Sequence, residues 1–593
     1  MARLVLIESA ENTPLARVLA ALGVIFERRS LAQALAFPKE RAASTAVILS
    51  EEELVKSVGV DRNDPTVLKA LLAGYRHALL YPFRGTARGL QTLSECVEGR
   101  AEVLPVTAGD KPRYSVATGF AAAGPFAGLD VEATGATTDR RLLIRESPYA
   151  IDHIVSAGDG GLLTKITFPL SELFVISSSA VFDVEAEMTK NLDVRACFSG
   201  LVPLLFFLRH SQAAFWRASF PAANVIIDDL NLRPNYGFVN AHTLAGHVEE
   251  FGYSVSVAFI PWNCNRASRD VIELFRARSP RLSLAIHGCD HVGAEFSTSS
   301  VSDSVPMIAL SLDRMQSLKA RTGLGYDRVM VFPQGRFSLN AMAALRQSEF
   351  IGAVNTELVD DLTHRGVRAQ ELLMPAITSF AGFPLFMRRK AHEPIANFAL
   401  DLLLGKPCLV VTHHHDFQRG MQPFAALVAS LNALDARLQW TNLETIVSRT
   451  YSIRTQSASS VDIRLFASTT ALESQDRGTE ICFSKAEPLV DKDFEIVVAG
   501  QVMKSDRDGS DIVFRQVLTA AESPVVNVQV SPIETGPLPI HTLTYRTRVA
   551  ARRYLSEIRD NHVARSPWAT AAMRSTRQVL NGSAFTRRPA RHG

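Results

Sequence analysis

The sequence has little cysteine and no long hydrophobic run, and both absences narrow the kind of protein that it can encode. Its six cysteines are spread over 593 residues without a Cys-x-x-Cys pair, which argues against a zinc knuckle and a disulfide framework. The apolar stretch 201–208 contains Pro203 and ends at Arg209, well short of the roughly 20 residues that cross a bilayer. We therefore expect reduced, mostly buried thiols and no transmembrane helix.

Net charge, targeting signals and phosphate-binding loops are also scarce. A formal net charge of +3 is too small, at this length, to indicate a specific nucleic-acid partner. Residues 1–12 pass from an apolar run into acidic residues without the basic region and cleavage site of a signal peptide. The first 83 residues hold no G-x-G-x-x-G and no G-x-x-x-x-G-K-[ST], so no nucleotide site is predicted there. These absences favour a cytoplasmic protein.

Composition shifts divide the chain into several regions, as expected because a single core stops growing at about 250–300 residues. Residues 1–100 alternate apolar runs with helical patterns, which predicts a small α/β domain of Rossmann or flavodoxin type. Residues 101–220 predict a β-rich segment with a connecting helix, and residues 451–550 a β-sandwich-like domain. Residues 551–593 carry nine arginines and two acidic residues, which predicts a basic tail that is either solvated or in contact with acidic surfaces.

Residues 221–450 repeat a strand-then-helix unit. The predicted strands cover residues 223–227, 254–260, 282–286, 329–332, 351–354 and 409–411, and the predicted helices cover residues 239–251, 269–278, 306–322, 338–348 and 423–434. Such alternation predicts parallel strands with right-handed crossovers, either closed into a barrel or lying as an open sheet. In both arrangements the carboxyl ends of the strands meet at one rim, where α/β folds build active sites.

Four polar signatures stand at the ends of these apolar runs. They are Asp228-Asp229, His287-Gly-Cys-Asp-His291, Phe332-Pro-Gln-Gly335 and His413-His414-His415-Asp416. Asp229, His287 and His291 supply one carboxylate and two imidazoles, a set that binds zinc or a similar divalent ion. A helical turn would place the two histidines, four residues apart, on one face. Asp228, beside a ligand, is positioned to take a proton from water that a metal has made more acidic, so the predicted reaction is metal-assisted hydrolysis.

The order of the signatures resembles that of the polysaccharide deacetylases, the family with the NodB-homology domain that removes acetyl groups from glycans. The resemblance covers about residues 221–450. The resemblance rests on four features: the strand ending in Asp228-Asp229, the motif His287-x-x-x-His291, the loop Pro333-Gln-Gly335 and the last strand Leu409-Val-Val-Thr-His413. The resemblance implies a distorted (β/α) barrel with Asp229, His287 and His291 on a divalent metal, Zn²⁺ with Co²⁺ or Mn²⁺ as alternatives. It further implies Asp228 as the base and a late histidine as the acid.

Several positions depart from that family pattern. Leu230 follows the Asp pair where the family has glycine, Gly288 stands where a serine or threonine usually follows the first metal histidine, and Val331 stands where an arginine is expected. Three histidines replace one at the last strand: alignment favours His413 as the acid, while strand alternation points His415 the same way and His414 the opposite way. Residues predicted to shape the substrate side are Pro333, Gly335, Arg336 and Tyr236.

The sequence thus predicts an α/β chain whose central barrel is catalytic, flanked by an N-terminal α/β domain and a C-terminal mainly β domain. The predicted activity is divalent-metal-dependent deacetylation of an amino sugar, a glycan or a glycan precursor. One alternative is a catalytically silent glycan-binding or assembly protein on the same barrel, and another is a metal-dependent hydrolase of a non-sugar amide or ester. An Asp pair alone is commonly a helix cap and Pro-Gln-Gly a turn, so the prediction depends on the joint order of the four signatures.

Overall fold

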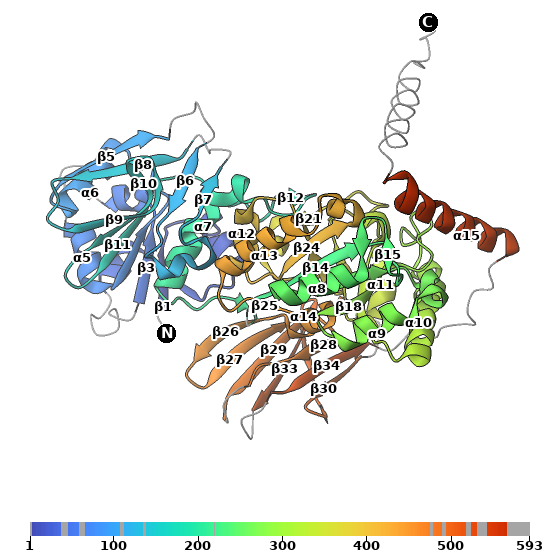
Figure 1. The fold of residues 1–593 in the computed structure, drawn as a ribbon. Coiled ribbons are helices and arrows are strands. Elements are labelled where there is room, and N and C mark those ends of the chain that lie inside the picture. Colours follow the sequence, from blue (N-terminus) through green and yellow to red (C-terminus); the bar gives the residue numbers. More distant parts are fainter. Residues whose placement is uncertain are drawn as a thin grey trace, which may run out of the picture.

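The computed structural model describes residues 3–36, 45–57, 66–106, 112–133, 138–218, 220–474, 478–488, 494–517, 523–530 and 542–565. Figure 1 shows the N-terminal region, blue to teal, at one end and the central region, green to yellow, beside it. The β-rich region that follows, orange to brown, lies against the central region, and the red helix α15 (Leu543–Ile558) lies on the far side from the N-terminal region. Within the described ranges, no helix has the length and apolarity needed to cross a membrane.

The N-terminal region is built on one 11-stranded sheet. Strands β2, β1, β3, β4 and β11 are parallel neighbours, and β11–β10–β9–β6–β7 continue the sheet in antiparallel fashion. The strands are β1 (Arg3–Ile7), β2 (Phe26–Arg29), β3 (Thr45–Leu49), β4 (His77–Leu80), β5 (Arg100–Pro105), β6 (Arg113–Val116), β7 (Asp130–Glu132), β8 (Arg140–Arg145), β9 (Ala150–Ala157), β10 (Gly160–Thr167) and β11 (Glu172–Ile176). Residues 1–100 and 101–220, predicted as separate regions, therefore share one sheet.

Helices accompany this sheet. They are α1 (Pro14–Ala21), α2 (Leu31–Leu35), α4 (Glu51–Ser57), α5 (Thr66–Gly74), α6 (Ala87–Cys96) and α7 (Val194–His210). The connecting helix predicted before the central region is α7, and its residues from Phe198 to Leu208 are all buried. That burial explains why an apolar stretch interrupted by a proline is tolerated here: the helix packs in a core shared by the N-terminal and central regions.

The central region is a nine-stranded sheet of parallel strands, as the strand-then-helix repeat predicts. Its order is β22-β20-β19-β18-β17-β14-β24-β23, with β25 beside β14. The strands are β14 (Ala222–Asp228), β17 (Val255–Phe259), β18 (Leu282–Ile286), β19 (Asp327–Val331), β20 (Gly352–Asn355), β22 (Leu385–Met387), β23 (Arg389–Lys390), β24 (Cys408–His413) and β25 (Gln439–Trp440). The helices are α8 (Ala241–Phe251), α9 (Arg269–Ala277), α10 (Val301–Thr322), α11 (Leu339–Arg346), α12 (Ile395–Leu403), α13 (Gln422–Leu434) and α14 (Leu443–Arg449).

The closed barrel that the family resemblance implies is not what the sheet forms. The hydrogen-bonded order is an open path that begins at β22 and ends at β23. These two strands follow each other in the chain with only Arg388 between them, β22 pairing with β20 and β23 with β24. One extended segment, from β22 to β23, thus forms both edges of the sheet, first beside β20 and then beside β24. The two edges are brought together by continuity of the chain at Arg388 rather than by a ladder of hydrogen bonds.

Alternate residues of the central strands enter two different cores. Val225 and Ile227 of β14 belong to the large core that extends into the N-terminal region, whereas Ile226 faces a second core. In this second core the central strands pack against Ile446 and Val447 of α14. Burial of both faces explains why β14 is apolar from Ala222 to Ile227 apart from the buried Asn224, and the strand ends where its polar side chains reach the rim.

The C-terminal region forms two sheets that share one hydrophobic core. The first contains β13 (Arg217–Ala218), β26 (Tyr451–Ser457), β27 (Ser460–Leu465), β29 (Glu480–Ala486), β33 (Asp511–Val517) and β32 (Asp506–Asp508). The second contains β28 (Thr469–Ala471), β34 (Val525–Val530), β30 (Phe494–Val498) and β31 (Gln501–Val502). Phe483 of the first sheet and Val528 of the second meet in this core, the arrangement of a sandwich.

The predicted basic tail differs from the structure over its first part. Residues 551–558 belong to α15, and the chain continues through the π-helical turn η6 (Arg559–Val563). Arg553 and Asp560 of this segment are buried. The rest of the predicted tail, residues 566–593, lies outside the described residues. The sequence signal was misleading because the inner face of α15 is polar and meets polar partners, as described below.

Candidate active site

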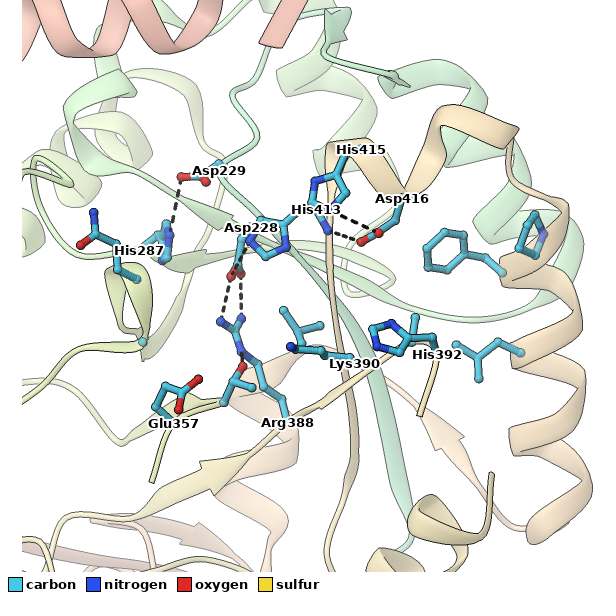
Figure 2. Close-up of a pocket in the computed structure, with 18 of the residues that line it drawn as sticks. Asp228, Asp229, His287, Glu357, Arg388, Lys390, His392, His413, His415 and Asp416 are labelled. Atoms are coloured by element: carbon cyan, nitrogen blue, oxygen red, sulfur yellow. Dashed lines mark hydrogen bonds and ion pairs between the residues drawn. The ribbon is translucent and has the colours of Figure 1, made fainter. Parts of the chain in front are cut away.

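The carboxyl ends of the central strands surround a pocket of about 650 Å³ that contains most of the predicted site residues (Figure 2). Its walls include Asp228, Asp229, His287, His291, Gln334, Gly335, His413 and His415 from the predicted signatures. They also include Thr356, Glu357, Arg388, Lys390, His392 and Asp416. The pocket therefore unites segments that are far apart in sequence, as the meeting of parallel strand ends at one rim requires.

Asp229, His287 and His291 converge on one point beside the pocket. Oδ1 of Asp229 lies 3.7 Å from Nε2 of His287 and 3.3 Å from Nε2 of His291. Ligands on a tetrahedral zinc at about 2.0–2.1 Å are about 3.3 Å apart, so these spacings suit a metal ion better than direct hydrogen bonds. Oδ1 of Asp229 and Nδ1 of His291 are buried without a hydrogen-bond partner among the described residues. The group therefore fits a divalent cation.

The protonation of both histidines also suits metal binding. Nδ1 of His287 lies 2.9 Å from the carbonyl oxygen of Val331, and because a carbonyl can only accept, Nδ1 must donate. In the neutral ring this leaves the lone pair of Nε2 free toward Asp229. Burial lowers the pKa of His291 despite the attraction of Asp229, so this imidazole is neutral at neutral pH.

The backbone that presents these ligands is a strained loop and not the helical turn predicted for His287 and His291. Residues 287–300, all of them described, contain no helix, and His291 itself adopts a φ of 56°. Asp229 has a φ of 69°, so two of the three ligands occupy the left-handed region that non-glycine residues rarely adopt. Such strain persists only where surrounding contacts hold it, and it concentrates at functional sites.

Gly288 is explained by the packing of this loop. Its φ is 65°, and a Cβ atom there would lie 2.3 Å from Cγ of Pro333 and 2.1 Å from Oε1 of Glu295. The serine or threonine expected from the family pattern would therefore clash with the Pro333 loop. Glu295 accepts hydrogen bonds from the backbone N–H groups of Cys289, Asp290 and Val292, which stabilises the ligand loop from below. The departure at Gly288 thus follows from close contact between two of the predicted signatures.

Asp228 is held by an arginine that the sequence pattern did not indicate. Nη1 and Nη2 of Arg388 donate to the two carboxylate oxygens of Asp228 at 2.7 and 2.8 Å, and both side chains are buried (Figure 2). Burial alone would raise the pKa of Asp228, but the charge of Arg388 is the main opposing influence, and the pKa lies below its usual range. Asp228 is therefore ionised at neutral pH.

The arginine that contacts Asp228 is not at position 331, where the family pattern places one, but at the break between β22 and β23. Its Nε also donates to Oγ1 of Thr356 at 3.0 Å. A usable signal exists in the sequence: Arg388 and Arg389 directly follow the apolar run Leu385–Met387. This run has only three residues, too few for a periodic pattern, so its polar end did not stand out.

Only His413 of the three consecutive histidines belongs to β24; His414 and His415 begin the 3-10 turn η5 (His414–Arg419), so the strand alternation used in the prediction does not extend to them. His413 and His415 line the pocket, with their rings stacked at 5.4 Å between centroids. Nε2 of His413 lies 3.8 Å from Oδ2 of Asp228. His414 is buried, is absent from the pocket wall and lies 3.4 Å through Nε2 from Oδ1 of Asp560. Only His413 and His415 of the three can therefore reach a molecule in the pocket.

Of the four residues predicted for the substrate side, one lines the pocket and three do not. Gly335 lines the pocket, with Gln334 beside it in the left-handed region at a φ of 59°. Pro333 is buried behind Gly288. Arg336 is about half exposed, forms a bidentate ion pair with Asp361 and does not line the pocket. Tyr236 is also outside the pocket wall and donates its hydroxyl hydrogen to Asp560 at 2.9 Å.

A second group with the same donor types lies in the N-terminal region. His77, Glu172 and His210 bring two imidazoles and one carboxylate together at the starts of β4 and β11 and the end of α7. Nδ1 of His77 is 2.9 Å from Oε2 of Glu172, and Nε2 of His210 is 2.7 Å from the same oxygen. These are hydrogen-bond distances, shorter than the ligand spacing on a metal.

Comparisons with known proteins find similar solved structures only. No protein-family model matches the sequence, and no curated protein matches it. The crystal structure of Agd3, a carbohydrate deacetylase, covers 89% of this chain and 98% of its own at 11% identity and a TM-score of 0.48. A family 4 carbohydrate esterase from Streptomyces lividans covers 38% of this chain and 93% of its own at 10% identity and a TM-score of 0.23. A family 4 pseudoenzyme from Bacillus anthracis covers 39% and 66% at 8% identity and a TM-score of 0.25.

The structures found are carbohydrate deacetylases and their relatives, the family that the motif order resembles. Identities near 10% and TM-scores below 0.5 are too low to assign an activity to this chain. The case for function therefore depends on the residues of the pocket.

Proposed function

We propose that this chain is a divalent-metal-dependent hydrolase that removes the acetyl group from an amino sugar, a glycan or a glycan precursor. The observation that carries the proposal is the placement, in one pocket, of a ligand group spaced for a metal and of a buried, ionised carboxylate beside it. These are the parts that amide hydrolysis by a bound metal requires. The motif order supports an acetylated sugar as the substrate.

Asp229, His287 and His291 would hold the metal, which we infer to be Zn²⁺ with Co²⁺ or Mn²⁺ as alternatives. When bound, the ion supplies Lewis-acid activation of the acyl carbonyl and of a water molecule. A site with three protein ligands would leave further coordination positions for water and substrate. The hydrogen bond from His287 to the Val331 carbonyl fixes the ring orientation that this requires.

Asp228 is the proposed general base. Its carboxylate is ionised and fixed in direction by Arg388, so it can accept a proton from the attacking water without first reorienting. Arg388 lowers the basicity of Asp228, an effect that is offset because the water itself is activated. The same ion pair keeps a buried negative charge compensated in the resting protein.

His413 is the proposed general acid, with His415 as the alternative. His413 lies across the pocket from the ligand group and within 3.8 Å of Asp228. Its position is set by Asp416, which accepts hydrogen bonds from the backbone N–H of His413 at 2.9 Å and from Oγ1 of Thr412 at 2.7 Å. Protonation of the leaving amine nitrogen by this imidazole would complete cleavage of the amide bond.

The proposal is tested by measuring acetate released from a panel of N-acetylated and O-acetylated sugars and glycans with added Zn²⁺, Co²⁺ or Mn²⁺. Acetate release that is abolished by a chelator and restored by one of these ions is the expected result. Release that persists after removal of the metal would contradict the proposed site. A wild-type protein that binds metal and glycan but releases no acetate would instead indicate the glycan-binding alternative. Release of acyl groups from non-sugar amides alone would indicate the remaining alternative, a metal-dependent hydrolase of non-sugar amides.

A further inference from the structure

Helix α15, which includes the first residues of the predicted tail, lies on the central region at the end away from the N-terminal region (Figure 1). Tyr545, Val549, Arg553 and Asp560 recur along α15 and η6 at spacings of four and seven residues, which places them on one face. This inner face contacts the metal-ligand loop, the loop after Asp229 and the turn after β24. Figure 2 shows the pale red helix on the Asp229 side of the pocket. The segment therefore contacts three parts of the site that are distant in sequence.

Asp560 joins two of these parts. Its Oδ2 accepts a hydrogen bond from the hydroxyl of Tyr236 at 2.9 Å, and its Oδ1 lies 3.4 Å from Nε2 of His414. The next residue, Asn561, accepts a hydrogen bond from the backbone N–H of Gly237 at 2.7 Å. Tyr236 and Gly237 belong to the loop that begins at the ligand Asp229. Asp560 is 3% exposed, so these bonds are shielded from water.

Tyr545 contacts the metal-ligand loop. Its hydroxyl donates to Oδ2 of Asp290 at 3.0 Å, and Asp290 lies between the ligands His287 and His291. The other oxygen of Asp290 accepts a hydrogen bond from Nη1 of Arg314 at 2.7 Å. The ligand loop is thereby held between α10 and α15.

The anchor of the helix is separate from the pocket. Glu557 forms a bidentate ion pair with Arg266, at 2.5 and 2.8 Å, and both side chains are mostly buried. The guanidinium of Arg266 also lies over the rings of Trp262 and Tyr554, at 5.0 and 4.6 Å from their centroids. None of these residues lines the pocket. The docking of the helix can therefore be broken without touching the pocket wall.

Docking of the helix leaves the pocket open. No described residue of α15 or η6 is part of the pocket wall, and the pocket retains its volume of about 650 Å³. A blocking segment would occupy that space. The helix instead contacts residues outside the pocket wall that are close in the chain to the proposed metal ligands and the proposed acid.

We propose that α15 and η6 are a positioning element for the deacetylation proposed above, in which Asp560 acts through Tyr236 and His414. By bonding both, Asp560 holds the loop that begins at Asp229 in register with the turn that carries His413 and His415. Without these two contacts of Asp560, Asp229 and His413 can move relative to each other. Misplacements of about 1 Å can cost about 100-fold in rate. The inference rests on the proposed function.

The test uses the full chain and an exchange of charges at the anchor. Glu557→Arg places two arginines together and is expected to release the helix, while Arg266→Glu combined with Glu557→Arg restores the ion pair in the opposite sense. Hydrogen exchange reports docking directly: faster exchange is expected in residues 230–240 and 412–420 of Glu557→Arg, with recovery in the double variant. Glu249→Arg is the matched control, because it breaks the exposed ion pair with Arg278 on the central region.

Turnover is measured on the same proteins. We expect kcat for acetate release to fall about 10- to 100-fold in Glu557→Arg with little change in KM, to return within about threefold in the double variant, and to be unchanged in Glu249→Arg. Faster exchange in Glu557→Arg with unchanged kcat would overturn the inference. So would a fall in kcat that the double variant does not recover although its exchange rates do.

A second variant serves if Glu557→Arg does not fold. Asp560→Asn preserves the size of the side chain but removes its charge, and Tyr236→Phe removes one of the two bonds. We expect kcat to fall in both, more in Asp560→Asn, with metal content unchanged. Unchanged kcat in both would contradict the role of Asp560. A wild-type protein without acetate release contradicts the proposed function instead, and the exchange measurements still decide whether the helix holds these loops.

Discussion

Two groups of two histidines and one carboxylate lie in different regions of this molecule, and their distances differ in a way that composition does not reveal. In the N-terminal group, both imidazoles are within 2.9 Å of one oxygen of Glu172. In the central group, Oδ1 of Asp229 is 3.3 and 3.7 Å from the two imidazole nitrogens. The first spacing is that of hydrogen bonds and the second that of ligands around an ion. The same donor set can thus either link elements of the fold by hydrogen bonds or have the spacing that binds a cation.

The surroundings of the two groups differ in the same sense. Nζ of Lys165 lies 4.0 Å from Oε1 of Glu172, so a cation already balances the N-terminal carboxylate. In the central group, Oδ1 of Asp229 and Nδ1 of His291 are buried without partners among the described residues, and both residues have positive φ. Unsatisfied polar atoms and backbone strain both cost stability. Natural proteins keep destabilising features of this kind mainly at functional sites. This favours the central group as the functional one.

Substitution of one histidine in each group gives the largest expected difference. We expect about one divalent ion per chain in the wild type, almost none in His287→Ala, and an unchanged amount in His77→Ala, because a three-ligand site loses most of its affinity when one ligand is removed. Metal analysis of the purified proteins measures this. Two ions per chain in the wild type, with one lost in each variant, would show that the hydrogen-bonded group also holds a metal.

Neutralising Asp228, beside the central group, and Glu172, within the N-terminal group, separates an effect on catalysis from an effect on the fold. Asp228→Asn removes the proposed base and is expected to lower acetate release about 10²- to 10⁴-fold with metal content preserved. Glu172→Gln makes the same chemical change in the N-terminal group and is expected to leave kcat and KM unchanged. Initial rates on the substrate found in the panel decide the matter. Equal losses in the two variants would mean that the N-terminal group contributes to turnover.

Much of the central region could be predicted because its strands are mostly apolar runs that alternate with helical patterns. Residues 282–286 were predicted as a strand and form β18, and residues 254–260 enclose β17. Strand ends carry side chains to one rim whatever the curvature of the sheet, so the order of the strands along the chain suffices to group Asp228, Asp229, His287 and His291. Whether the sheet closes depends on how its two edges meet, which the local pattern does not record.

Arg388 and α15 were missed for a different physical reason. The segment that carries Arg388 consists of a three-residue strand and a two-residue strand separated by the arginine itself, too short for a periodic pattern. The inner face of α15 and η6 is made of Tyr545, Arg553 and Asp560 around Val549, so hydrophobic periodicity is weak. Arg388 and Asp560 are buried, and each has a polar partner on a distant segment of the chain. Such pairings are tertiary information that a single sequence does not display.

The stability of the metal-free protein should respond oppositely to the two groups. Glu172→Gln disrupts hydrogen bonds to two imidazoles and is expected to lower the free energy of unfolding by about 1–3 kcal/mol. Asp229→Asn replaces a partly exposed carboxylate whose Oδ1 is buried without a hydrogen-bond partner among the described residues, and Asn tolerates the left-handed backbone there. We therefore expect little loss, or a gain, from Asp229→Asn. Urea unfolding of chelator-treated proteins measures both, and a larger loss from Asp229→Asn would contradict this ranking.

The smallest expected effect is the pH dependence of the bond at Glu172. Hydrogen bonds from His210 and His77 hold the pKa of Glu172 below its usual range. A carboxyl group with a lowered pKa in the folded state contributes its full stability above the unfolded pKa, about 4.3, and loses it as the pH falls through the folded value. The difference in unfolding free energy between wild type and Glu172→Gln should therefore be larger at pH 5.5 than at pH 3.5, by about 1 kcal/mol. A difference that grows as the pH falls would show that Glu172 is not the acceptor of these hydrogen bonds, and the contrast drawn between the two groups would fail on the N-terminal side.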